Sequence, residues 1–169
     1  MNESPLTETQ TRILSAARSL LEHRSVGELR IRDIAQAAGL SPASVYGHFR
    51  GKEELLRALW ELEALELAER YRRALETAAD GVGGMVAFGY TVFSDFAGYA
   101  RSRARAIEFL LNSRSGQTAK SALARGHHQL RALLVSALQR TFPKIPLPRA
   151  KAMADLTLAI ISGLALAHL

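Results

Sequence analysis

The 169-residue sequence contains no cysteine, which excludes a disulfide framework and a thiolate metal site. Its N-terminus lacks the basic start and apolar run of a secretion signal. Its two most apolar stretches, residues 85–99 and 156–169, are shorter than the roughly 20 residues that a membrane-spanning helix needs. We therefore expect a cytoplasmic protein without a membrane partner.

Alternation of apolar and polar residues with period two is also missing, and helical periodicity dominates. We expect an all-α chain with a loop at 79–84 and helices over about 8–24, 31–38, 42–48, 52–77, 85–99, 106–111, 119–142 and 149–169. Thr7 and Gln10 have the spacing of a capping box, and Ser41-Pro42 predicts a helix start. The net charge of +6 favours a polyanionic partner.

The most informative segment is IRDIAQAAGLSPASVYGHF, at residues 31–49. Two helices that cross steeply through a tight turn need a small residue at the crossing, here Ala35. They also need a residue that tolerates a left-handed backbone in the turn, here Gly39. The apolar positions fit anchors into a third helix: Ile31, Ile34, Leu40, Val45 and Phe49. This pattern predicts a helix-turn-helix, although such helix pairs also occur as plain structure.

The run from Ile13 to Leu59 resembles the N-terminal domain of tetracycline-repressor-type (TetR) regulators, through RDIAQAAGLS, SVYGHF and KEELL in that order. The resemblance implies a helix-turn-helix DNA-binding domain over residues 1–52 and a helical ligand-binding and dimerisation domain over 53–169. It also implies a homodimer, formed through the last two helices, that binds double-stranded DNA and responds to a small-molecule effector.

Carried over residue by residue, the resemblance implies DNA contacts from the reading helix and from the start of the next helix. The reading-helix positions are Pro42, Ala43, Ser44, Tyr46, Gly47 and His48. Lys52 matches a phosphate contact. Arg32 can also reach a phosphate, although a solvated face is the alternative. Tyr46 could instead pack between helices, and His48 could be solvated or capping.

The same resemblance places an apolar effector cavity in the second domain. Its candidate lining residues, which core packing would explain equally well, are Trp60, Tyr90, Phe93, Phe96, Phe109, Asn112 and His127. Neighbouring histidines on a helix point about 100° apart, and no carboxylate lies four residues from His127 or His128, so we expect no metal and no cofactor.

The sequence therefore predicts a ligand-responsive regulator, acting as a repressor on a palindromic operator, and not an enzyme. The alternative is a small-molecule-binding or adaptor protein whose helix-turn-helix serves as a protein-interaction surface.

Overall fold

A computed structural model describes residues 6–77, 81–112 and 116–167 of the chain. Within these ranges, the side chains at 96, 99–100, 102–104, 106–112, 116–123, 125 and 165–167 lie outside the description. The described residues form seven helices and no strand, which confirms the all-α prediction. The helices are α1 (Glu8–Leu21), α2 (Ile31–Ala37), α3 (Pro42–His48), α4 (Lys52–Glu76), α5 (Gly81–Asn112), α6 (Gly116–Thr141) and α7 (Leu147–Ala167).

The predicted start and stop signals are present. Thr7 Oγ1 accepts a hydrogen bond from the Gln10 N–H at 3.2 Å, and the Gln10 side chain accepts one from the Thr7 N–H at 2.9 Å. Ser41 Oγ accepts from the Ser44 N–H at 3.1 Å, with Pro42 in the first helical position of α3. Gly39 has a φ of 65°, the left-handed value expected in the turn.

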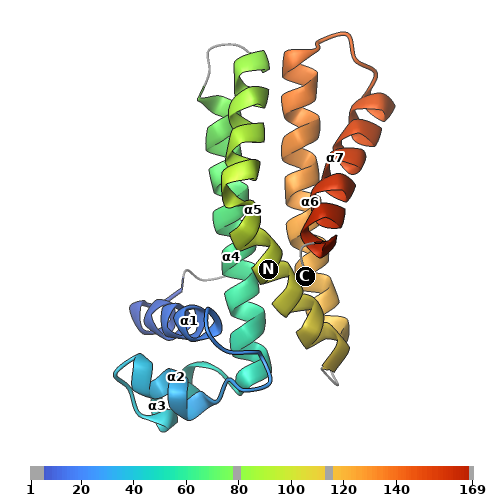
Figure 1. Cartoon of the computed structure of the whole chain (residues 1–169). Helices are drawn as coiled ribbons and strands as arrows, with labels where there is room; N and C mark the ends of the chain where they lie inside the picture. Colours follow the sequence, from blue (N-terminus) through green and yellow to red (C-terminus); the bar gives the residue numbers. More distant parts are fainter. Residues whose placement is uncertain (1–5, 78–80, 113–115, 168–169) are drawn as a thin grey trace.

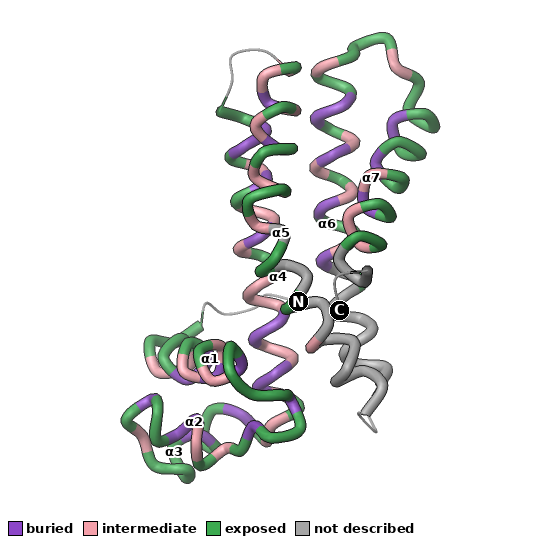
Figure 2. Tube along the Cα trace, viewed as in Figure 1, coloured by how far each residue is buried: buried purple, intermediate pink, exposed green. Residues whose placement is uncertain are grey.

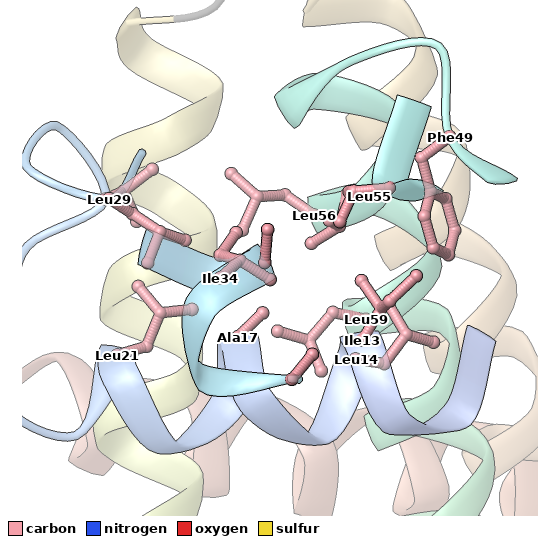
Figure 3. Packing of buried hydrophobic residues seen from close by; sticks show 14 of the residues in the cluster. Ile13, Leu14, Ala17, Leu21, Leu29, Ile34, Phe49, Leu55, Leu56 and Leu59 are labelled. Carbon is pink, nitrogen blue, oxygen red and sulfur yellow. The ribbon is translucent and has the colours of Figure 1, made fainter. Parts of the chain in front are cut away.

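The first three helices pack around the first turns of α4 at one end of the molecule (Figure 1). Figure 3 shows this core, in which side chains from α1, α2 and α4 point toward one another. Ile13, Ile34 and Leu59 are fully buried there, and Ala35 is buried where α2 crosses its neighbours. The periodicity of the apolar residues therefore places them in the core as predicted.

Helix α4 runs without a break from this core into a bundle with α5, α6 and α7 (Figure 1). Its first turns contribute Leu55, Leu56 and Leu59 to the N-terminal core, whereas Leu67 and Tyr71 belong to a second core in the bundle. The expected domain boundary after residue 52 thus falls at the start of a helix that both cores share.

Helix α5 departs from the sequence prediction. Residues 81–84 were expected in a loop and residues 85–111 in two helices, but one helix spans Gly81–Asn112. The helix begins with glycines because neighbouring segments pack closely against its first turn. A Cβ added to Gly84 would lie 2.4 Å from the Leu75 carbonyl oxygen, and one added to Gly81 would overlap Thr141. Close packing therefore explains these glycines better than a loop does.

Over the described part of the chain, none of the helices is long and apolar enough to cross a membrane.

Candidate nucleic-acid interface

Helix α3 presents one apolar side to the core and its remaining residues to solvent. Val45 is fully buried, and Phe49, which follows the helix, is 4% exposed. These two side chains fix α3 against the N-terminal core, so that the expected contact positions lie on the surface: Pro42, Ala43, Ser44, Tyr46, Gly47 and His48. We call these six residues the α3 face.

Tyr46 is 57% exposed, so it does not pack between helices, which was the alternative explanation for an aromatic residue here. His48 is also exposed and lies in the last turn of α3. The Ser44 hydroxyl lies 3.1 Å from the Ser41 hydroxyl. Hydroxyl and imidazole groups can donate to phosphate oxygens and exchange hydrogen bonds with base edges.

Gly47 lies between these polar residues, and a Cβ added to it would meet no atom within 4 Å. Internal packing therefore does not require a glycine here. The missing side chain instead leaves the backbone open to close approach from outside.

Lys52 is half-buried at the start of α4, and its Nζ donates a hydrogen bond to the Gly27 carbonyl at 3.4 Å. The loop that carries Gly27 is itself held, since the Ser25 N–H and Oγ each lie 3.0 Å from Glu28 Oε2. These hydrogen bonds lower the pKa of Glu28. The ammonium is thus held against a structured loop between α1 and α2.

Three further arginines surround α3 in the sequence. Arg30 precedes α2 without a side-chain capping bond, and both it and Arg32 are exposed. Arg32 Nε lies 3.5 Å from Asp33, whose other carboxylate oxygen pairs with Arg24 at 3.0 Å. Sequence reasoning overlooked Arg50, which is exposed between α3 and α4; its place in the basic run RGK was the available signal.

Residues 13–59, which contain the α3 face and Lys52, match the bacterial regulatory proteins of the tetR family. The match covers the helix-turn-helix domain and the first turns of α4.

Solved structures of transcriptional regulators share the fold along nearly the whole chain. A TetR transcriptional regulator from Legionella pneumophila is 15% identical with a TM-score of 0.74, covering 96% of this chain and 88% of its own. SmeT from Stenotrophomonas maltophilia, in complex with triclosan, is 22% identical with a TM-score of 0.69. The match covers 94% of this chain and 79% of SmeT. The regulator FadR from Bacillus subtilis, in complex with stearoyl-CoA, is 18% identical with a TM-score of 0.60. The match covers 92% of this chain and 84% of FadR.

The expected effector residues do not come together in one cavity. Trp60 is buried in the N-terminal core, whereas Tyr90 and Phe93 point to solvent on α5. His127 is half-buried on α6, next to His128. The side chains of Phe96, Phe109 and Asn112 lie outside the description.

A groove of about 480 Å³ lies instead between α4 and α6. Its lining residues are Leu65, Ala68, Glu69, Arg72, Gln129, Ala132, Leu133 and Ser136. The floor is apolar, and Arg72 is paired with Glu69 at 2.6 Å. No sequence signal pointed to this groove, because none of its lining residues is aromatic. Among the residues described, no cluster of three metal-ligating side chains occurs.

Proposed function

We propose that this protein is a ligand-responsive transcriptional regulator of the cytoplasm, which represses by binding a palindromic operator as a homodimer and is released by a small molecule. The observation that carries the proposal is the α3 face, which buried Val45 and Phe49 hold rigidly outward from a tetR-family domain. A short helix fixed in this way can enter the major groove, with its first residues near base edges.

The groove between α4 and α6 supports the effector part of the proposal. It combines an apolar floor with a few polar groups, the composition that small-molecule sites share. Solved relatives hold triclosan in one case and stearoyl-CoA in another, both of which carry large apolar parts. We infer an effector that is largely apolar with a polar group able to reach Gln129 or Ser136.

Helix α4 supplies a mechanical connection between groove and α3 face. It lines the groove through Leu65 and Ala68 and joins the N-terminal core through Leu55. Arg18 of α1 also binds α4, with ion pairs of 3.4 Å to Glu63 and 2.9 Å to Glu66. An effector that shifts α4 would therefore move α1–α3 with it, and the two α3 helices of a dimer would change their separation.

Selection from random duplex DNA tests the regulator directly. We expect an enriched palindrome with half-sites about 34–36 Å apart, one helical turn. Lys52→Ala should weaken binding to all sequences and reduce the salt slope by about one, because one phosphate contact is lost. Ser44→Ala and His48→Ala should instead change which sequence is preferred.

Arg140→Ala is the matched control for Lys52→Ala, since it removes one positive charge from the exposed C-terminal turn of α6, far from α3. It should leave DNA affinity unchanged. Selection without an enriched palindrome would refute the specific regulator. Failure to bind any duplex even at low salt would favour the adaptor, whose α3 face contacts protein.

A further inference from the structure

A second groove, of about 400 Å³, lies between α6 and α7. Figures 1 and 2 show these two helices side by side, with their connection at the end of the bundle opposite α1–α3. The residues that line this groove alone are Lys151 from α7 and His128, Arg131, Val135 and Gln139 from α6. Two of these five side chains are cationic and none is acidic. We call it the cationic groove, and we call the groove between α4 and α6 the apolar groove.

The positive charge of the chain originates in the segment that contains α6 and α7. Residues 109–169 contain eight Lys and Arg residues and one acidic residue, Asp155, whereas residues 1–108 contain 14 Lys and Arg residues and 15 acidic ones. The net charge of +6 therefore does not come from the helix-turn-helix. A segment of this composition favours an anionic partner near α6.

Lys151 carries the charge of the cationic groove that is available to a ligand. Asp155 follows it by one turn on α7 and binds Arg131, whose Nη2 donates to Asp155 Oδ2 at 2.8 Å. Lys151 itself is exposed and forms no ion pair among the described residues. An anion in the groove would thus meet the ammonium of Lys151 directly, with the guanidinium of Arg131 on the opposite wall.

The apolar groove is electrically balanced on its α4 side. Glu69 accepts hydrogen bonds from Arg72 at 2.6 Å and from Arg73 at 2.8 Å, and Arg72 also pairs with Glu76. Two arginines are thus matched by two glutamates, so this side neither attracts nor repels an anion strongly. The negative end of a bound molecule would therefore be drawn away from α4 and toward Lys151.

The two grooves are neighbours on the outer side of α6. Ala132 and Ser136 line both of them and lie four residues apart, on one face of the helix. Both residues are exposed and small, so they form a low ridge that one molecule can cross. The volumes of about 480 and 400 Å³ each fall within the roughly 300–1,000 Å³ of small-molecule sites.

We propose that the two grooves form one site for an amphipathic anion. Its apolar chain lies between α4 and α6, and its carboxylate or phosphate group lies at Lys151. The Ser136 hydroxyl and the Gln139 amide line the same groove and can donate hydrogen bonds to that group. The inference deepens the proposed function and rests on it, because it assigns a negative charge to the effector. The apolar groove alone would accept a neutral molecule equally well.

Calorimetric titration of the full chain with decanoate, decyl phosphate and the neutral decanol tests the anionic group. At low salt and neutral pH, we expect both anions to bind at least about fivefold more tightly than decanol. Lys151→Met keeps an unbranched side chain and should remove most of this difference without changing the affinity for decanol. The anion that binds more tightly identifies the group as carboxylate or phosphate.

Lys144→Met is the matched control. Lys144 is exposed in the connection between α6 and α7 but lines neither groove, so its removal should leave all three affinities unchanged.

Thiol protection tests whether one molecule spans both grooves. Since the chain has no cysteine, Gln139→Cys introduces a single thiol into the cationic groove, and Gln129→Cys introduces one into the apolar groove. Saturating decanoate should largely abolish the reaction of both thiols with a maleimide, whereas decanol should protect thiol 129 alone. The thiol of Lys144→Cys should react equally fast with and without either compound.

The proposal is overturned if the wild type binds neither anion, or if decanol binds as tightly as decanoate. It is also overturned if Lys144→Met weakens anion binding as much as Lys151→Met, or if decanoate leaves thiol 139 reactive. Release of the selected operator separates this inference from the proposed function. Decanoate that protects both thiols but leaves the operator complex intact would retain the site and remove its role as effector site. Release by decanol, without preference for the anions, would do the reverse.

Discussion

Replacing Gly47 by alanine separates the stability of α3 from its use on DNA. Glycine costs a helix about 0.5–1 kcal/mol relative to alanine, because it loses more backbone freedom on folding. Gly47 lies within α3, and among the described residues the left-handed φ is at Gly39. An added Cβ at 47 meets no atom within 4 Å. Neither backbone strain nor a steric clash therefore offsets the stability gained by replacing glycine with alanine. Gly47→Ala should therefore stabilise the free protein by about 0.5–1 kcal/mol, or about 1–4 °C in Tm.

The matched control is Gly39→Ala, the same substitution eight residues earlier. Space is also open there, but a φ of 65° costs an L-residue about 1–2 kcal/mol. The two variants should thus move the free energy of unfolding in opposite directions, and urea titrations followed by circular dichroism measure both. A destabilised Gly47→Ala would refute the packing argument.

DNA binding gives the second readout for Gly47→Ala. On the α3 face, the new methyl group would occupy space between the helix and the groove, so we expect weaker binding to the selected operator and unchanged binding to non-specific duplex. Equal operator affinity of variant and wild type would show that position 47 faces away from the groove.

Two further substitutions test local contacts. Ser41→Ala removes the side-chain acceptor of the Ser44 N–H and should destabilise the protein by about 1 kcal/mol in chemical denaturation, whereas Ser41→Asp, which keeps an acceptor, should not. Hydrogen bonds from Arg72 and Arg73 lower the pKa of Glu69 from 4.5 to about 2. The stability that follows from this shift is present above pH 4.5 and lost as the pH falls toward 2, so Glu69→Gln should flatten the acid side of a Tm-against-pH curve between these values. An unchanged curve would show that the exposed pair is screened by solvent.

Much of the N-terminal domain could be predicted from the sequence because its signals are local. Ser41-Pro42 starts α3 and Gly39 adopts the left-handed turn, and both depend on residues close in the chain. The burial of Val45 and Phe49 follows from helical period, and the exposure of the six α3-face residues follows from that burial. Both the core residues of α3 and its exposed face could therefore be predicted from the sequence.

The second domain was less predictable because its decisive contacts are distant in sequence. Gly81 and Gly84 suggested a loop, yet they open α5 because Thr141 and Leu75 leave no room for a side chain. The aromatic residues Tyr90 and Phe93 suggested a cavity wall, and the structure places them outside.

By itself, the sequence determined the helical class, the helix-turn-helix and the residues that α3 turns outward, since caps, turns and helical period act within a few residues. Only the tertiary structure decided which faces of α4–α7 cover one another. That packing places a groove between α4 and α6 and leaves Tyr90 and Phe93 of α5 exposed, because the partner of an apolar face depends on how helices far apart in the chain are arranged.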